Sequence, residues 1–317
     1  MKIVLLEPLF VPDPALERLS DSFRADGHKF VSYATREEDD EIILSRAADA
    51  DIVMIGNLPL SGQVICGLRK LKMISVAFTG VDHVALDACR ARGITVCNCA
   101  GYSTDSVAEL SFGLMIAVLR NLVQCDRATR EGKTRAGLIG HDLSGKTLGI
   151  IGTGAIGLRV AQIGKAFGCR LLACSRSQRI EAVNLGVRYV FFDELLEASD
   201  IVTLHVPLTD ETGGMISREK IALMKSSAIL INTSRGPVVD NIALADALEK
   251  GEIAGAGIDV FDIEPPLNPQ DPLLKQKKAV FAPHVAFATW EAFDRRATLA
   301  VNNVTQWLNG TPVNVID

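Results

Sequence analysis

The chain has 317 residues, and 38 acidic against 33 basic side chains give it a net charge of −5 at pH 7. Hydrophobic residues make up 48% and charged residues 22%, the composition of an ordinary globular protein. At about 100–200 residues per domain the length fits two domains, and the mild acidity argues against a nucleic-acid-binding protein.

No apolar run approaches the roughly 18 residues of a membrane span. The apolar run at the N-terminus is broken by Glu7 and Pro8, so it is too short for a signal peptide. The seven cysteines are scattered and odd in number, which favours a reducing compartment. Cys97 and Cys99 have no second Cys/His pair at zinc spacing, so no metal site is predicted. We therefore expect a cytoplasmic protein that binds neither metal, nor nucleic acid, nor membrane.

Short β-branched runs alternate with helical patterns over the first hundred residues. Strands are expected at Ile3–Leu6, Ile52–Ile55, Met73–Phe78 and Ile94–Cys97, and helices at Ala15–Ala25, Glu37–Ala48 and Leu86–Arg92. Such alternation predicts an α/β fold, a parallel sheet with helices on both faces.

A long helix is predicted over Asp105–Asn121, where apolar residues recur at three- and four-residue spacing. No Pro/Gly/Ser-rich linker is present, so we expect this helix to bridge two domains. A second series of strands follows at Thr147–Gly152, Arg170–Cys174, Ile201–Leu204, Ala228–Asn232, Gly257–Val260 and Ala279–Ala282. From Trp290 on, a last helical pattern is expected to cross back to the first domain.

The second series opens with a glycine pattern, Gly152-Thr153-Gly154-Ala155-Ile156-Gly157, between an apolar strand and a helical run, Leu158–Phe167. This context is typical of a dinucleotide-binding turn. Gly152 allows the tight turn, Gly154 lets a pyrophosphate approach the backbone, and Gly157 lets helix and strand pack closely. The N–H groups at the start of the helix, those of Ala155 and Ile156, then face the anion.

The residues at the end of the second strand of this series bear on the type of cofactor. A carboxylate about 20 residues after the glycines binds the ribose 2′-hydroxyl of NAD. The sequence has Ser175, Arg176, Ser177 and Arg179 there instead. Hydroxyl and guanidinium groups suit a 2′-phosphate, so NADP(H) is favoured over NAD(H). In the alternative interpretation Arg176 only stacks on the adenine, and both cofactors bind.

Polar residues also follow three later strands. Arg235, Asp259, Glu264 and His284 lie at or just past strand ends, where ligands of open α/β sheets bind. Arg can hold a carboxylate or polarise a carbonyl, and His can donate a proton near neutral pH. A 2-keto acid is therefore a suitable substrate for this set.

The chain resembles the D-isomer-specific 2-hydroxyacid dehydrogenases over nearly its whole length. The motifs that carry the resemblance are Phe78-Thr79-Gly80-Val81-Asp82, Val107-Ala108-Glu109, the glycine turn, His205-Val206-Pro207-Leu208-Thr209, Asn232-Thr233-Ser234-Arg235-Gly236, Asp259-Val260-Phe261 with Glu264-Pro265, and Pro283-His284. The resemblance implies two doubly wound parallel-sheet domains, with a Rossmann cofactor domain (101–287) inserted into a flavodoxin-like substrate domain (1–100 plus 288–317).

The resemblance also implies a role for each site residue. Arg235, Glu264 and His284 are the expected catalytic residues: His284 is the general acid in reduction, Glu264 tunes it, and Arg235 binds the substrate. Asp259 is expected to orient the nicotinamide carboxamide, and Thr104, Val206, Pro207, Thr212, Thr233 and Ser234 to line the cofactor, which Arg235 and His284 also contact. The N–H groups of Gly80 and Val81 are expected to hold the substrate carboxylate. A homodimer built around the Asp105–Asn121 helix is implied as well.

The chain departs from the family pattern at three places, one of which is the missing carboxylate after the second strand of the later series. Thr134–Leu138 lacks the Trp that members often carry there, and the chain lacks the extra C-terminal domain of many phosphoglycerate dehydrogenases. Glu264 speaks against the formate dehydrogenase branch, in which an amide is usual.

The substrate side chain is expected to meet Phe10 and Leu58, as an apolar wall, and one polar group, Asn57. No Lys/Arg cluster accompanies these loops, which disfavours 3-phosphoglycerate. Glyoxylate, hydroxypyruvate or a similar small keto acid is the favoured substrate, and larger apolar keto acids remain open. The alternatives are a phosphoglycerate dehydrogenase, a cofactor-sensing protein like the C-terminal-binding corepressors, and a dehydrogenase of phosphite or another oxyanion.

Overall fold

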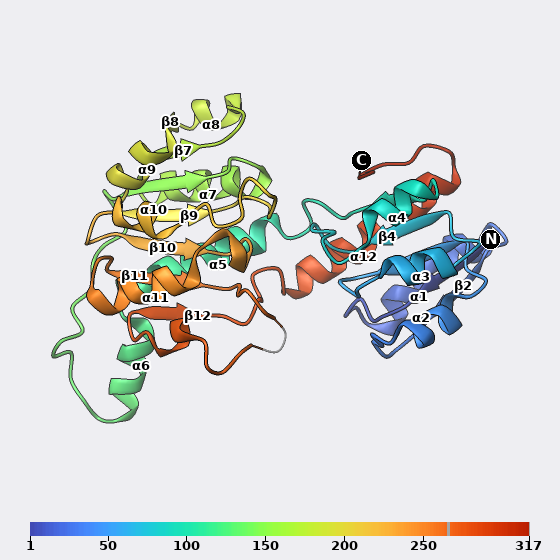
Figure 1. Cartoon of the computed structure of the whole chain (residues 1–317), viewed down its shortest axis with the longest axis horizontal. Helices are drawn as coiled ribbons and strands as arrows, with labels where there is room; N and C mark the ends of the chain where they lie inside the picture. The colour runs from blue at the N-terminus through green and yellow to red at the C-terminus, as the bar shows by residue number, and fades with distance from the viewer. Residues whose placement is uncertain (265–266, 317) are drawn as a thin grey trace. The chain divides into compact units, whose positions relative to one another are not determined.

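The computed structural model describes residues 1–264 and 267–316, and the chain forms two compact units (Figure 1). Unit 1 comprises Met1–Ser103 and Ala288–Asp317, and unit 2 comprises Thr104–Phe287. Each unit is built on its own sheet, so the two are described separately. Pro265, which belongs to one of the family motifs, lies outside the described residues.

Unit 1 contains a five-stranded sheet in which all strands are parallel. The strands are β1 (Lys2–Leu5), β2 (Lys29–Ser32), β3 (Ile52–Ile55), β4 (Met73–Val76) and β5 (Thr95–Cys97), in the order β2-β1-β3-β4-β5. This is the flavodoxin-like strand order. The chain adds strands first toward one edge of the sheet and then toward the other, and this change occurs between β1 and β3.

The helices of unit 1 form two groups, as right-handed crossovers require. Helix α1 (Asp13–Ala25) packs on α12 (Trp290–Leu308), which also contacts β4. Helices α2 (Asp40–Ala47), α3 (Gly62–Gly67) and α4 (Leu86–Ala91) pack on one another in sequence. Between the two groups, strands such as β3 and β4 are buried on both faces, which explains their continuous apolar runs.

Unit 2 contains a seven-stranded parallel sheet in the order β12-β11-β10-β9-β6-β7-β8. Its strands are β6 (Thr147–Ile151), β7 (Arg170–Cys174), β8 (Arg188–Tyr189), β9 (Ile201–Leu204), β10 (Ile229–Asn232), β11 (Gly255–Ile258) and β12 (Ala279–Phe281). The strand order is that of a Rossmann sheet extended by one strand. The side of the sheet to which the chain adds strands changes between β6 and β9. The predicted α/β class with two parallel sheets is confirmed.

Two hydrophobic cores hold helices on the two faces of this sheet. The helices are α5 (Thr104–Leu119), α6 (Leu122–Arg130), α7 (Ala155–Ala166), α8 (Ile180–Asn184), α9 (Phe192–Ala198), α10 (Arg218–Ala222) and α11 (Asn241–Lys250), with short 3₁₀ turns at Gly236–Val238 and Pro272–Lys275. One core joins α5 and α7 through residues such as Phe112, Met115 and Val160. The other joins α9, α10 and α11 through residues such as Leu195, Ile221 and Leu244.

The expectation that the long helix bridges two domains is wrong. All of α5 belongs to unit 2, where it packs on α7 and on β10, β11 and β12. Two glycines of β11 permit this packing: a Cβ at Gly255 would lie 2.6 Å from Val118 Cγ1, and one at Gly257 would lie 2.8 Å from Leu114 Cβ. The apolar side chains of α5 therefore pack within unit 2.

The same glycines explain a second error. The strand predicted at Gly257–Val260 is β11 and runs from Gly255 to Ile258, because glycines in a strand carry no apolar signal. Helix α7 begins at Ala155 rather than at Leu158. The short strands β2 and β8 were not predicted.

In the described part of the chain, no individual helix is both long enough and apolar enough to cross a bilayer. Helices α5 and α6 pass such a test only when taken as a pair, with a 60° bend between them.

Candidate active site

The glycine turn after β6 has three glycines with three different constraints. Gly152 adopts φ +92°, and a Cβ there would lie 2.5 Å from the carbonyl oxygen of His205. A Cβ at Gly157 would lie 1.9 Å from the carbonyl oxygen of Gly152. Around Gly154, by contrast, nothing lies within 4 Å of an added Cβ. The first and third glycines are therefore required by the fold, whereas the second leaves open space in front of the helix.

Helix α7 starts directly behind this open space. Gly154 is its N-cap residue, and no side chain caps the helix. The first N–H groups of a helix have no partner within the helix, so those of Ala155 and Ile156 are available to an anion. This arrangement fits the pyrophosphate of a dinucleotide.

A cavity of about 410 Å³ adjoins the turn and lies at the point where the strand order reverses. It is lined by Gly152, Thr153 and Gly154 after β6, by residues 174–177 and Arg179 after β7, and by His205, Val206, Pro207, Thr209, Glu211, Thr212 and Met215 after β9. Seven residues expected at the cofactor line it: Gly152, Gly154, Ser175, Arg176, Val206, Pro207 and Thr212. The space is of the size of ligand pockets in general.

Hydrogen bonds from side-chain hydroxyl groups connect the loops around the cavity. Tyr189 Oη donates to Thr153 Oγ1 at 2.9 Å and accepts from the Arg179 N–H at 3.0 Å. Thr212 Oγ1 donates to the Pro207 carbonyl oxygen at 2.6 Å and thereby folds the loop after β9. Sequence reasoning missed Tyr189, because it lies on a two-residue strand that has no periodicity to detect.

His205 lies in the same wall but is not set up for acid–base chemistry. Its Nε2 pairs with Thr203 Oγ1 at 3.0 Å, and burial lowers the pKa of the imidazole to about 3. The ring is therefore neutral at physiological pH. In this environment His205 has no role in acid–base chemistry.

His284 and Glu264 form a close pair in unit 2. His284 Nδ1 lies 2.7 Å from Glu264 Oε1, and both side chains are mostly buried. Glu264 Oε2 also accepts from the Phe261 N–H at 3.3 Å. The ring of Phe287 meets the imidazole edge-on, with the ring centres 5.6 Å apart. Nδ1 is thus committed to the carboxylate, which leaves Nε2 to exchange a proton with a ligand.

Asp259 fixes the backbone that carries His284. It is completely buried, its Oδ1 accepts from the Val285 N–H at 2.8 Å, and its Oδ2 accepts from the Ala286 N–H at 2.9 Å. The His284 N–H donates to the Asp259 carbonyl oxygen at 2.7 Å, and His284 itself has φ +53°. Burial raises the pKa of the Asp259 carboxyl, and the two N–H groups oppose that rise. This geometry gives Asp259 a role in holding the loop of His284.

Arg235 follows β10 on a turn folded by Asn232. The buried Asn232 Oδ1 accepts from the Ser234 N–H and from Ser234 Oγ, and its Nδ2 donates to the Arg235 carbonyl oxygen at 3.0 Å. At Gly236 a Cβ would lie 2.1 Å from the Phe261 carbonyl carbon. The Arg235 turn therefore lies directly against the loop of Glu264.

The remaining cofactor candidates of unit 2 lie near the same edge of the sheet. Thr233 Oγ1 lies 3.1 Å from Ser111 Oγ, whose hydroxyl donates to Val107 O on α5, and Thr104 is the first residue of α5. The three catalytic candidates, Arg235, Glu264 and His284, thus all follow strands at the carboxyl edge of one sheet.

In unit 1 the candidate substrate residues follow β3 and β4. Gly80 and Val81 are partly exposed, and among the described residues nothing accepts a hydrogen bond from their N–H groups. The predicted apolar wall is half wrong: Phe10 is 62% exposed, but Leu58 is completely buried and cannot face a ligand. Asn57 is exposed, and its Oδ1 accepts from Arg36 Nη1 at 2.7 Å.

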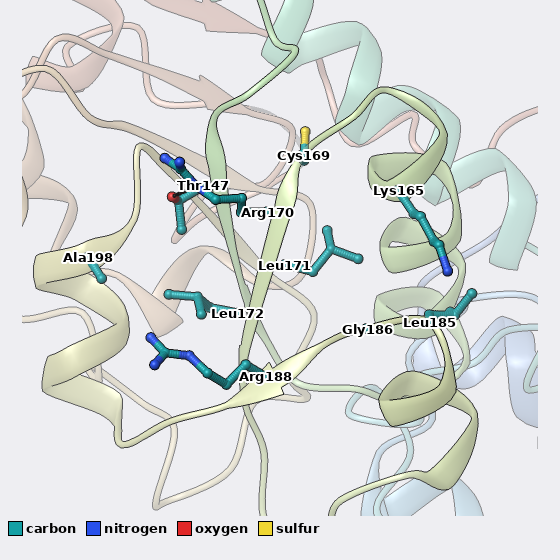
Figure 2. Close-up of a pocket in the computed structure, with 10 residues that line it drawn as sticks. All are labelled: Thr147, Lys165, Cys169, Arg170, Leu171, Leu172, Leu185, Gly186, Arg188 and Ala198. Carbon is teal, nitrogen blue, oxygen red and sulfur yellow. Dashed lines mark hydrogen bonds between the residues drawn. The ribbon is translucent and has the colours of Figure 1, made fainter.

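Figure 2 shows the residues that line a second cavity of unit 2, which has a volume of about 500 Å³. This cavity lies at the amino ends of β6 and β7. Thr147 and Arg170, the first residues of β6 and β7, line it together with Lys165 and Arg188. It is separate from the glycine turn, so it has no part in the site described above. Among the described residues, no cluster of three or more His, Cys, Asp or Glu side chains forms a metal site.

Comparison with known proteins finds one matching family profile and several similar proteins. The family profile "D-isomer specific 2-hydroxyacid dehydrogenase, NAD binding domain" matches residues 112–286. The glyoxylate reductase of Korarchaeum cryptofilum is 39% identical over 315 residues, which cover 97% of this chain and 93% of that protein. The hydroxypyruvate reductase of Blautia hydrogenotrophica is 35% identical and is aligned over 100% of both chains. Among solved structures, an acyclic imino acid reductase (Bsp5) in complex with NADPH and D-Arg has a TM-score of 0.90 at 27% identity, over 100% of both chains.

The two glycines at the start of α7 provide a matched pair of variants. Gly157→Ala is expected to destabilise the protein by about 1–3 kcal/mol or more, because its Cβ meets a backbone oxygen that cannot move aside. Gly154→Ala meets no atom and is expected to keep the wild-type stability while it weakens dinucleotide binding. Urea unfolding and cofactor titration measure both effects. Equal stability of the two variants would contradict this interpretation of the turn.

Proposed function

The chain belongs to the D-isomer-specific 2-hydroxyacid dehydrogenase family, and we propose that it reduces small 2-keto acids such as glyoxylate or hydroxypyruvate to D-2-hydroxy acids. It is an NAD(P)-dependent oxidoreductase, so hydride moves between the nicotinamide cofactor and C2 of the substrate. The observation that carries the proposed mechanism is the 2.7 Å pair of His284 Nδ1 and Glu264 Oε1.

His284 is the proton donor in this proposal. Its Nδ1 is held by Glu264, so in reduction the protonated ring gives the proton on Nε2 to the carbonyl oxygen of the substrate. In oxidation the neutral ring takes the hydroxyl proton back on the same nitrogen. Asp259 keeps the imidazole in place through the Val285 and Ala286 N–H groups.

Substrate orientation is assigned to Arg235 and to two backbone groups. A guanidinium binds a carboxylate with two parallel hydrogen bonds and polarises a neighbouring carbonyl. The N–H groups of Gly80 and Val81 have no acceptor within the described residues, which supports their use for the substrate carboxylate. The cofactor supplies the hydride, and the glycine turn and the first turn of α7 hold its pyrophosphate.

The role of His284 predicts a selective loss of activity. His284→Ala is expected to lower kcat by about 10²–10⁴, the usual contribution of a general acid, with unchanged affinity for the cofactor. Absorbance at 340 nm with glyoxylate, hydroxypyruvate and pyruvate measures the rate, and fluorescence titration measures cofactor binding. His28→Ala, at a partly exposed histidine of unit 1, is the control. Wild-type turnover in the His284 variant would refute the assignment.

We further propose that the enzyme prefers NADP(H). No carboxylate follows β7, and Ser175, Arg176 and Arg179 line the cavity there. Among the described residues neither arginine forms an ion pair, so both charges are available to a 2′-phosphate. The similar imino acid reductase structure contains NADPH, which is compatible with this proposal.

Replacing one arginine tests the cofactor preference. Arg176→Ala is expected to raise KM for NADPH by roughly 10–100-fold, the value of a charged hydrogen bond of about 1.5–3 kcal/mol, and to change KM for NADH less than twofold. Arg188→Ala, at an exposed arginine of β8 outside this cavity, is the control. A similar loss for both cofactors would favour stacking of Arg176 on the adenine.

We also propose a homodimer, formed through α6 and residues 131–142. Because α5 is used inside unit 2, the exposed apolar residues lie beyond it: Leu122 is 48%, Val123 57% and Ile139 86% exposed, and α6 has no buried residue. A helix with an apolar face and no cover is stabilised by a symmetric contact with a second copy.

Light scattering tests the dimer. The expected mass is about twice 34.1 kDa, and the double variant Val123→Glu/Ile139→Glu is expected to have the monomer mass, since the contact would bury like charges. A monomeric wild type at all working concentrations would contradict the proposal.

A further inference from the structure

Glu7 is a nearly buried carboxylate at a position where ligands bind. Only 3% of the residue is exposed, and it follows β1 by two residues. Strands β1 and β3 are the two between which the order of the unit 1 sheet reverses. Crevices at such points, outside the carboxyl ends of the strands, take ligands in open α/β sheets. A buried charge here is costly unless every oxygen is satisfied.

The partners of Glu7 all belong to two neighbouring loops. Its Oε1 accepts from the N–H groups of Gly56 at 2.8 Å and Leu58 at 2.6 Å, and its Oε2 accepts from Arg36 Nη1 at 2.6 Å. Gly56 has little room, because an added Cβ would lie 3.3 Å from Glu7 Oε1. The carboxylate therefore fixes the backbone on both sides of Asn57.

Arg36 in turn fixes the side chain of Asn57. Its Nη1 donates to Asn57 Oδ1 at 2.7 Å, and its Nη2 lies 3.3 Å from the Asn57 carbonyl oxygen. A guanidinium has donors only, so the amide oxygen must face Arg36 and the NH₂ group must face away. Among the described residues nothing accepts from Asn57 Nδ2. The loop thus presents a neutral hydrogen-bond donor at the edge of the sheet.

We propose that Asn57 Nδ2 donates a hydrogen bond to an oxygen on C3 of the substrate, with Glu7 and Arg36 as positioning residues. The inference rests on the proposed function, in which the N–H groups of Gly80 and Val81 bind the substrate carboxylate. Those groups follow β4, the direct neighbour of β3. Adjacent strands are about 4.8 Å apart, a separation comparable to the three bonds from the carboxylate carbon to an oxygen on C3.

The charges around Asn57 define which oxygen is recognised. Arg36 lies 2.6 Å from Glu7 and 2.9 Å from Glu38, so its positive charge is neutralised within the protein. The charge of the Arg36 guanidinium is therefore not available to bind a phosphate group. An uncharged hydroxyl matches the amide donor, which makes hydroxypyruvate preferred over pyruvate, and disfavours 3-phosphorylated substrates.

The test compares three keto acids that differ only at C3. Hydroxypyruvate has a hydroxyl on C3, pyruvate has only hydrogens there, and glyoxylate has no C3. Asn57→Ala is expected to raise KM for hydroxypyruvate roughly 3–10-fold, the value of a neutral hydrogen bond, with kcat unchanged. KM for pyruvate and glyoxylate should change less than twofold. Asn184→Ala, at an exposed asparagine of α8, is the matched control.

The positioning role is tested by a double-mutant cycle. Glu7→Gln should raise KM for hydroxypyruvate alone, and the double variant Glu7→Gln/Asn57→Ala should be no worse than Asn57→Ala. If Glu7→Gln does not fold, Arg36→Met removes the same clamp from the partly exposed side. Additive effects, or equal losses on all three keto acids, would reduce Glu7 to a structural residue and overturn its role.

The two proposals fail in different ways. An active wild type whose Asn57→Ala variant loses nothing, or loses equally on all three substrates, overturns this inference and leaves the proposed function standing. A wild type inactive on all three keto acids with either cofactor overturns the proposed function, and this inference with it.

Discussion

The parallel direction of all strands in each sheet is the constraint on which the site depends. In a parallel sheet every strand ends at the same edge, so loops far apart in the sequence become neighbours. In unit 2 this edge holds the glycine turn after β6, Arg235 after β10 and His284 after β12. This close packing of loops requires glycine at one position. The turn after β6 passes so close to the loop after β9 that no Cβ fits at Gly152. A side chain at that position would separate the loops that form the cofactor cavity.

Both units use a buried carboxylate to hold a functional loop. Asp259 accepts the Val285 and Ala286 N–H groups next to His284, and Glu7 accepts the Gly56 and Leu58 N–H groups next to Asn57. A carboxylate without partners would be strongly disfavoured in either place. Two N–H groups from one short loop satisfy it only when that loop has a single conformation. The charge therefore costs stability in isolation but makes the loop geometry specific.

Features that depend on residues close together in the sequence are predicted well. Features that depend on contacts between residues far apart in the sequence are not. Strands β3 and β9 have the bounds predicted from their mainly apolar runs, because burial on both faces is a local signal. The glycine turn is also predicted from the sequence, because its glycines lie between an apolar strand and a helical run. Strand β11 is displaced in the prediction because Gly255 and Gly257 serve contacts with α5, more than a hundred residues away.

The substrate side of the site shows the same limit. Asn57 is visible in the sequence as a polar residue after a strand, but Glu7 and Arg36, which hold it, are 50 and 21 positions away. Leu58 was expected to face a ligand because it is apolar and lies in a loop. Its N–H is bound by Glu7, and its side chain is turned into the core instead. Pairwise contacts of this kind leave no periodicity in the chain, so only the structure reveals them.

The arginines near the proposed substrate loop and near the cofactor cavity differ in whether their charges are neutralised by carboxylates. Arg36 has its charge neutralised by Glu7 and Glu38, whereas among the described residues Arg176 and Arg179 have no acidic partner. A phosphate dianion gains most from an unpaired guanidinium, because a paired one must first give up its carboxylate. In the proposed function, the affinity for phosphate is therefore concentrated at the cofactor cavity. At the proposed substrate loop, the neutral donor of Asn57 suits a small keto acid with a free hydroxyl better than its phosphate ester.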